Sequence, residues 1–490
     1  MNRVRVPDQR AIVDRRALAE TVAEAARHDD PREGRRAVVA ALREALEQGR
    51  GELARRLAAR PSAGHEITAG HSFLVDQLIR VIHGHVTSAV YPAGNRSTGE
   101  RLAIMAVGGY GRAEMAPHSD VDIAFLVGEK RNAWAEQVVE AMLYLLWDLG
   151  LKVGHSTRSL DEMIRLARGD LTIRTAMLEG RYVWGDQDLY EEGAARFQAE
   201  VVRGNERAFV SEKLEERNAR HKRMGDSRYV VEPNIKDGKG GLRDLHTLYW
   251  IGKFIHRVRS AADLVGVGLL TSAEYRSFRR AENFLLAVRC HLHTLTGRAE
   301  DRLTFDMQRQ IAAAMNFADR PGKSAVERFM QFYFLQAKHV GSLTGIFLAH
   351  IDEQLAASRP RAGFFAAWTQ RARTVRGYKV FGGRIAAPTD DWFERDPVRL
   401  IEIFQIAEAE QLEVHPETMR LANRDARLID ARVRADPRAN ALFLDLLAGR
   451  NDPEMVLRWM NEAGVFGRFV PDFGRVNAQM QFDMYHHYTV

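Results

Sequence analysis

The apolar positions change their spacing near residue 100, and this change separates regions of different predicted structure. Residues 1 to about 95 carry apolar side chains at helical spacing, as in ALAETVAEAARH, AVVAALREALEQ and HSFLVDQLIRVIHGHV. Leu102 to Val107 is instead an unbroken apolar run closed by two glycines, which predicts a buried strand. A second strand is predicted over Asp120 to Val127, after the turn residues PHS.

A helix and a third strand complete a small predicted α/β core. AEQVVEAMLYLLWDLG places its large apolar residues on one helical face and ends at Gly150, and LKVGHSTRS follows as a strand. Beyond about residue 160 the pattern predicts an almost wholly helical chain with one interruption, EPNIKDGKGG, which precedes an amphipathic helix. Further joints are predicted near ADRPGKSA and SRPRAG.

Composition narrows the class of protein. A chain of 490 residues with 46% apolar and 28% charged residues is typical of a globular protein with several domains. No apolar run approaches the roughly 20 residues that span a bilayer, and the charged N-terminus MNRVRVPDQR lacks a secretory signal. We therefore expect a cytoplasmic protein without a membrane partner. The lone Cys290 lies in an apolar stretch and is expected to be buried.

The net charge of +6 does not indicate nucleic-acid binding. It arises from 71 basic and 65 acidic side chains, and no dense basic stripe with interleaved aromatic residues is present. We therefore expect no nucleic-acid partner. No pattern in the chain indicates its oligomeric state.

The segment GGYGRAEMAPHSDVDIAFLV, residues 108–127, carries the candidate chemistry. Alternate side chains of a strand share a face, so Asp120 and Asp122 point toward the same small volume. Such a pair favours a hard divalent cation, Mg²⁺ or Mn²⁺. The backbone at Gly108 and Gly109 can approach anionic oxygens closely, and Ser119 adds a hydroxyl donor. Together these residues predict a nucleoside-triphosphate site. Neither a P-loop nor a complete GxGxxG motif is present.

This segment resembles the signature of the nucleotidyltransferase superfamily related to DNA polymerase beta. More narrowly, it is similar to that of the bifunctional uridylyltransferase/uridylyl-removing enzymes of bacterial nitrogen control, the GlnD family. EPNIKDGKGGLRDLHTLYWIGKF resembles that family's helical domain, and the segment from FLDLLAGRNDPEM to the C-terminus resembles the entry to its HD hydrolase domain. The implied fold class is α+β, a small polymerase-beta-like nucleotidyltransferase α/β core with a large helical remainder.

The resemblance implies a reaction, an acceptor and site residues. The family moves UMP from UTP to a tyrosine of the PII signal protein. By position, Asp120 and Asp122 would hold the metal, and Gly108 and Gly109 would form the phosphate turn. Ser119 would be a phosphate or structural donor. The remaining predicted nucleotide-binding residues are Arg112, Lys236, Lys239 and Arg243.

Some of these roles stay open at the level of sequence. Arg112 could contact a phosphate or form an ion pair with Glu114 or Asp120. The basic residues of the KDGKGGLR loop could contact triphosphate oxygens or pair with the loop's own aspartates. The third carboxylate that this superfamily commonly uses is not identified, because LKVGHSTRS contains no acid. His155 is a conceivable substitute.

The resemblance also implies a domain order. It comprises an N-terminal helical region (1–95), the nucleotidyltransferase core (96–215), a helical uridylyltransferase-associated domain (216–350), a helical linker region (351–430) and an incomplete start of the HD domain (431–490). The family continues beyond YHHYT with the rest of the HD domain and two ACT domains that sense glutamine. We therefore expect no UMP removal and no glutamine response from this polypeptide.

Two other functions remain compatible with these patterns. One is transfer of AMP to a protein, as in the glutamine synthetase adenylyltransferase, whose core is related. The other is a catalytically silent nucleotide-binding regulatory module.

Overall fold

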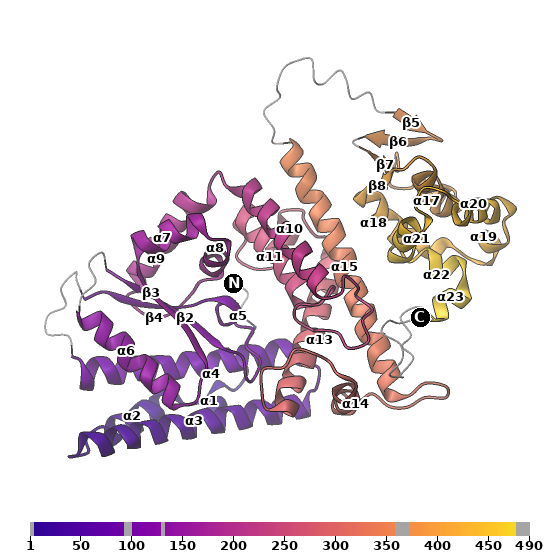
Figure 1. Ribbon diagram of the computed structural model, residues 1–490. Coiled ribbons are helices and arrows are strands. Elements are labelled where there is room, and N and C mark those ends of the chain that lie inside the picture. Colours follow the sequence, from indigo (N-terminus) through magenta and orange to yellow (C-terminus); the bar gives the residue numbers. More distant parts are fainter. Residues whose placement is uncertain (1–3, 93–99, 129–132, 358–372, 382, 477–490) are drawn as a thin grey trace. The chain divides into compact units, whose positions relative to one another are not determined.

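The computed structural model describes residues 4–92, 100–128, 133–357, 373–381 and 383–476 (Figure 1). The chain divides into two compact units. The first comprises Met1–Asp226, Glu232–Gly268 and Tyr275–Val326. The second comprises Ser227–Val231, Leu269–Glu274 and Glu327–Val490.

The N-terminal region is helical, as the sequence predicts. Its helices are α1 (Gln9–Ile12), α2 (Arg15–Ala25), α3 (Pro31–Ala59) and α4 (Gly64–His85), which a π-helical turn, η1 (Val86–Val90), extends. Helices α2, α3 and α4 pack against one another, and α3 and α4 run side by side in Figure 1. Asp14 and Asp30 cap α2 and α3 by accepting backbone hydrogen bonds from the first turn of each helix.

The predicted nucleotidyltransferase core contains a four-stranded mixed sheet of order β3-β2-β1-β4. The three predicted strands are present as β1 (Leu102–Ala106), β2 (Val121–Val127) and β3 (Val153–Ser159). Strand β1 is antiparallel to β2, and β2 is parallel to β3 with Asp122 opposite Gly154. The predicted helix between β2 and β3 is α6 (Ala133–Asp148), and Gly150 follows it in a left-handed conformation, with φ of 74°.

The two faces of the sheet are covered by different helices. Ile104, Ile123 and Phe125 are buried in one apolar core with residues of α4 and α6. The opposite face packs against α9 (Gln187–Phe197), and α7 (Leu160–Gly169) packs against β3. Because strand side chains alternate, Asp122 belongs to the second face, with Ala124 and Leu126.

The expectation of an almost wholly helical chain after residue 160 was wrong in two places. The first is β4 (Arg181–Gly185), which pairs antiparallel with β1 and completes the sheet. It is only five residues long and begins with an arginine, so its apolar run is too short to signal a strand. The buried Arg181 is compensated by Asp76, with Nη1 to Oδ2 at 2.7 Å.

The other elements of the first unit are helices. They are α5 (Gly108–Gly111), α8 (Leu171–Leu178), η2 (Gln198–Val202), α10 (Glu206–Arg223), α11 (Leu242–His256), α12 (Asp263–Gly266), α13 (Ser272–Thr296) and α14 (Phe305–Ala314). Helix α11 is the amphipathic helix predicted after the KDGKGG loop. Cys290 is buried in α13, as predicted.

The second unit contains the second departure from the prediction. The stretch predicted as a helical linker holds a four-stranded sheet formed by β5 (Arg373–Val375), β6 (Tyr378–Phe381), β7 (Arg384–Ala386) and β8 (Glu413–Val414). These strands have two to four residues each, too few to show a clear alternation. SRPRAG and the C-terminal YHHYT motif lie outside the described residues.

The other described elements of the second unit are helices, and most of them contribute residues to the core of this sheet. They are α15 (Ala325–Ala357), α16 (Trp392–Arg395), α17 (Arg399–Ala409), α18 (Pro416–Asp425), η3 (Ala426–Leu428), α19 (Ala431–Ala435), α20 (Pro437–Leu447), α21 (Pro453–Glu462), α22 (Phe466–Phe469) and α23 (Pro471–Val476). Tyr378 of β6, Leu442 of α20 and Phe469 of α22 belong to one apolar cluster. The chain on both sides of residue 430 therefore forms a common core, so the predicted boundary at 430 does not separate two packing units.

Candidate functional site

The two aspartates lie at the start of β2, beside the glycine turn. Asp120 is exposed and directly precedes the strand, and Asp122 is half-buried within it. The backbone N–H of Val107 donates to the carbonyl of Asp122 at 3.0 Å, which fixes the turn against the strand. Gly108 has φ of 59°, and a Cβ there would lie 2.9 Å from Asp122 Oδ2. The turn therefore requires glycine for both its backbone conformation and the space beside the carboxylate.

The other side of the Asp122 carboxylate is bounded by a second glycine. In the register of β2 and β3, Gly154 lies opposite Asp122, and a Cβ on it would lie 2.5 Å from Oδ1. His155 pairs with Ile123 and so belongs to the other face, where its ring lies 6.0 Å from that of Trp147. His155 therefore does not supply a third ligand beside Asp122.

The electrostatic environment of Asp122 fits a cation. Burial raises the pKa of Asp122, and the charge of Asp120 raises this pKa further. Within the described part of the chain, no side chain forms a hydrogen bond or ion pair with either carboxylate. A divalent cation with oxygen ligands would relieve this repulsion, so the residues present fit Mg²⁺ or Mn²⁺. No group of three or more metal-binding side chains occurs among the described residues.

The three predicted basic residues of the KDGKGGLR loop do not share one environment. Lys239 Nζ lies 2.9 Å from Asp226 Oδ1, and Arg243 Nε lies 3.2 Å from Asp237 Oδ1. Arg243 therefore forms the ion pair within the loop that the sequence left open, whereas Lys239 pairs with an aspartate outside the loop. Lys236 is 3.9 Å from Asp301 and lies close enough to Asp122 to lower its pKa. Burial and Arg289 lower the pKa of Lys236 itself. Lys236 is thus the loop cation whose charge acts on Asp122.

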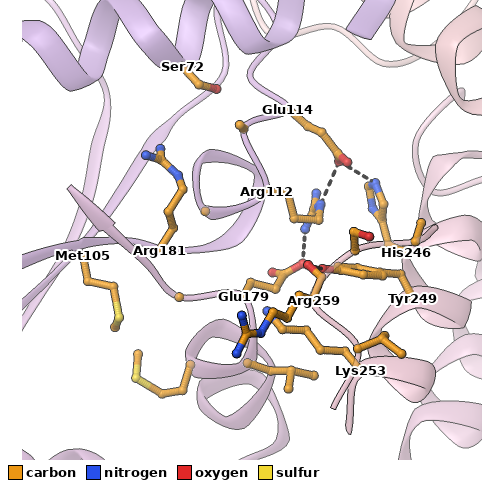
Figure 2. Close-up of a pocket in the computed structure, with 18 of the residues that line it drawn as sticks. Ser72, Met105, Arg112, Glu114, Glu179, Arg181, His246, Tyr249, Lys253 and Arg259 are labelled. Carbon is orange, nitrogen blue, oxygen red and sulfur yellow. Dashed lines mark hydrogen bonds and ion pairs between the residues drawn. The ribbon is translucent and has the colours of Figure 1, made fainter. Parts of the chain in front are cut away.

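Arg112 belongs to a buried ionic network behind the glycine turn (Figure 2). Its Nε donates to Glu114 Oε2 at 2.7 Å, and its Nη1 donates to Glu179. Burial alone would lower the pKa of Arg112, but Glu179 and Glu114 raise it. The ion pair with Glu114, one of the alternatives for this residue, is therefore present, and it occupies the guanidinium that could otherwise contact a phosphate.

The same network extends into α11. Trp250 Nε1 donates to Glu179, and His246 Nε2 lies 2.9 Å from Glu114 Oε2. A Cβ on Gly111 would lie 2.6 Å from the carbonyl oxygen of Glu179. The glycine turn, the start of β4 and the helix behind the basic loop are therefore held together by direct contacts.

Ser119 and Gly109 are near the aspartates in the sequence, but neither makes the close approach to the Asp122 carboxylate that Gly108 makes. Ser119 Oγ accepts from the backbone N–H of Ala116 at 3.0 Å, which closes the turn before Asp120, so Ser119 has the structural partner that one of its two predicted roles requires. A Cβ on Gly109 would meet its nearest neighbour, Arg112 Nη2, at 3.7 Å, which is ordinary contact distance.

Sequence patterns did not identify Glu179, Trp250 or Gly154 as parts of this site. Glu179 precedes the strand that the pattern missed, and Trp250 lies on an apolar helix face, where a core role is the default. The glycine in LKVGHSTRS was the available signal for Gly154, because an isolated glycine in a strand often marks a close approach.

A mixed sheet with paired aspartates beside a glycine turn, backed by helices, defines a nucleotidyltransferase core, as the α+β prediction states. Comparison with protein families agrees. The GlnD PII-uridylyltransferase model matches residues 208–348, and the model of the uridylyltransferase GlnD third domain matches residues 378–469. The chain belongs to the GlnD uridylyltransferase family, which confirms the resemblance.

Curated relatives carry the same family name. The bifunctional uridylyltransferase/uridylyl-removing enzyme of Novosphingobium aromaticivorans is 69% identical over 99% of this chain and 53% of the relative. The enzymes of the same name from Erythrobacter litoralis and Rhodospirillum rubrum are 68% and 50% identical, over 99% of this chain and 53% and 52% of the relatives. The chain thus spans about half the length of the curated relatives it matches. No helix among the described residues is long and apolar enough to cross a membrane.

Proposed function

We propose that this chain transfers UMP from UTP to a tyrosine of the PII signal protein in a reaction that requires Mg²⁺ or Mn²⁺. The observation that carries the proposal is the Asp122 carboxylate, which lies between Gly108 and Gly154 without an ionic partner among the described residues. The family models and the relatives' names support the choice of UTP and PII.

The residues of the chain would divide the work in the following way. Asp120 and Asp122 would hold the metal, which neutralises charge on the triphosphate and orients it. The backbone of the turn at Gly108 and Gly109 would approach phosphate oxygens. Lys236 would contribute a positive charge near Asp122, while Arg112 would hold the turn in place through Glu114 and Glu179.

The transfer exchanges one phosphorus–oxygen bond for another. The tyrosine oxygen bonds to the α-phosphorus of UTP and loses its proton, the bond from that phosphorus to the bridging oxygen breaks, and pyrophosphate leaves. The two carboxylates and the backbone donors of the glycine turn would act mainly by positioning these groups.

Incorporation of label from α-labelled UTP into purified PII tests the proposal. We expect incorporation that depends on Mg²⁺ or Mn²⁺ and falls by at least about 100-fold in Asp120→Asn and in Asp122→Asn. Asp188→Asn, at an exposed position of α9, is the matched control and should stay near wild type. Full activity in Asp122→Asn would overturn the proposal.

Nucleotide competition separates the remaining functions. An excess of unlabelled UTP should suppress incorporation, and the same excess of ATP should not. Preferred transfer of AMP would indicate the adenylyltransferase alternative. Binding of UTP with Mg²⁺ but no transfer to PII would indicate the silent module. This alternative stays open because the described residues contain no group of three metal-binding side chains.

A further inference from the structure

A partly open cavity lies within the first unit, apart from the aspartate pair. It is a cavity of about 720 Å³, and Asp120, Asp122 and Lys236 do not line it. Its lining residues come from the N-terminal segment, α4, β1, β2, α7 to α9, α11 with the loop after it, and α13. In Figure 2, Met105 and Arg181 lie on one side of Arg112, and Tyr249 and Lys253 lie on the other. Arg112 contributes to the wall and also lies behind the glycine turn, where its Nη2 would be 3.7 Å from a Cβ on Gly109.

The charges that line the cavity do not balance. Six basic side chains and four carboxylates contribute to its walls. Every one of the carboxylates already has an arginine partner. Asp76 pairs with Arg181, Glu114 and Glu179 pair with Arg112, and Glu282 pairs with Arg279. The remaining cations are Lys253, Arg257 and Arg259.

These remaining cations come from the end of α11 and the loop that follows. None of their side chains forms an ion pair or hydrogen bond with another described residue. The Tyr249 hydroxyl donates to the carbonyl of Arg259 at 3.1 Å, which ties the loop to the helix. Lys253 lies 5.9 Å from the Tyr249 ring, and its pKa is lowered by burial. Arg257 and Arg259 are exposed at the mouth of the cavity, whereas Lys253 is partly buried, and a partly buried cation without a counter-ion favours an anionic ligand.

One polar atom deeper in the cavity also lacks a partner. His246 is only 5% exposed, and its Nε2 lies 2.9 Å from Glu114 Oε2, but its Nδ1 has no hydrogen-bond partner among the described residues. Buried polar atoms usually have partners, so an unpaired ring nitrogen in a cavity wall indicates a missing donor or acceptor.

The opposite wall is apolar. It is formed by Met105, Leu126, Met163, Met177, Leu178 and Phe197. A wholly hydrated inorganic ion would leave this wall in contact with water. A ligand with an apolar body would cover it while presenting its charge to Lys253.

We propose that this cavity is a binding site for a small organic anion with an apolar body, whose acidic group is held by Lys253 and Arg259. The site is separate from the metal and triphosphate site and shares only the Arg112 network with it. A ligand here would act on the transfer reaction as an effector, because Arg112 and Glu179 connect the cavity to the glycine turn. The binding itself does not depend on the proposed reaction.

Fluorescence titration of the full chain with 8-anilinonaphthalene-1-sulfonate tests the site, since this probe joins a sulfonate to an apolar ring system. We expect saturable binding that Lys253→Met and Arg259→Gln each weaken at least about fivefold, the loss of one charged contact. Lys253→Arg should stay within about twofold of wild type, because the charge is kept. Lys222→Met, at an exposed position of α10, is the matched control. Melting temperatures show that the variants are folded.

Equal affinity of the probe for wild type, Lys253→Met and Arg259→Gln would overturn the proposal. In a second experiment, the titration with the probe is repeated at saturating Mg²⁺ and at a series of rising UTP concentrations. For a separate site the affinity of the probe changes by a limited factor that levels off as UTP rises. If the apparent Kd of the probe instead rises in proportion to the UTP concentration without levelling off, the probe and UTP compete. This result would show that the cavity is part of the nucleotide site and would also overturn the proposal. Because the readout is binding, failure of UMP transfer to PII would leave these outcomes unchanged.

Discussion

Asp122 lies opposite Gly154 in the parallel pair of β2 and β3, and a Cβ at Gly154 would come within 2.5 Å of Asp122 Oδ1. The side chain that we assign to the metal is thus positioned partly by the absence of a side chain on the neighbouring strand. Gly108 acts in the same way from the other side, at 2.9 Å from Oδ2.

Gly154→Ala should lower activity more than stability. The added methyl group forces the Asp122 carboxylate to rotate, which is easy for the end of a side chain but displaces the metal ligand. We expect kcat to fall about tenfold or more and the free energy of unfolding to change by less than about 1 kcal/mol. Steady-state transfer assays and urea unfolding measure the two effects. Gly51→Ala, in α3 with nothing within 4 Å of the new Cβ, is the control. Unchanged kcat in Gly154→Ala would contradict this account of the site.

Lys236 and Lys239 should differ in their effect on UTP binding, although they are only three positions apart in the sequence. Lys236→Gln removes a charge that acts on Asp122. We expect the KM for UTP to rise about tenfold or more, as for a lost charged contact. Lys239→Gln breaks an ion pair with the exposed Asp226 and should change KM by less than about threefold. Equal effects of the two substitutions would show that the loop acts as a whole.

Arg112→Gln should destabilise the first unit strongly. The substitution leaves two carboxylates, Glu114 and Glu179, without their arginine partner. The effect is large because the arginine side chain is only 9% exposed, so little water can replace it. Breaking a buried ion pair from one side costs about 3–5 kcal/mol. Arg36→Gln removes an arginine that is 76% exposed and pairs with Glu33, so it should change stability by less than about 0.5 kcal/mol. Denaturant unfolding followed by tryptophan fluorescence compares the two, and a mild effect of Arg112→Gln would mean that the network is hydrated.

Stability of the second unit should fall as the pH rises past neutrality. His350 Nε2 lies 2.6 Å from Glu417 Oε1, and this contact raises the pKa of His350 above its unfolded value. The stabilisation is fully present below the unfolded pKa and is lost as the pH rises through the folded pKa. Because both side chains are partly exposed, we expect a loss on the order of 0.5–1 kcal/mol.

His350→Gln isolates this contribution. The difference in unfolding free energy between wild type and the variant should be larger at pH 5.5 than at pH 8.5. A difference that does not depend on pH would mean that His350 stays neutral in the folded chain.

The aspartate pair and the glycine turn could be predicted from the sequence because their signals are local. An apolar run closed by glycines predicts a strand and a turn, and two aspartates one residue apart on a strand must share a face. These relations hold whatever the strand packs against. The same is true of α6 and α11, whose apolar faces repeat at helical spacing.

The elements that were missed have short signals. Strand β4 has five residues, and β5 to β8 have two to four each, so their pairing comes from neighbouring strands rather than from their own pattern. Glu179 acquires its place in the site only because β4 pairs with β1 and brings it under the glycine turn.

The sequence by itself determined the family, through its motifs, and the glycine turn, through the glycines that close an apolar run. It also determined the aspartate pair, because spacing along a strand fixes which side chains face the same way. The tertiary structure decided which of the three predicted loop cations acts on the aspartate pair. Lys236, Lys239 and Arg243 are equivalent along the chain, yet two of them are neutralised by Asp226 and Asp237. The partner of a charge is set by distances in space, and these depend on how strands and helices far apart in the sequence pack together.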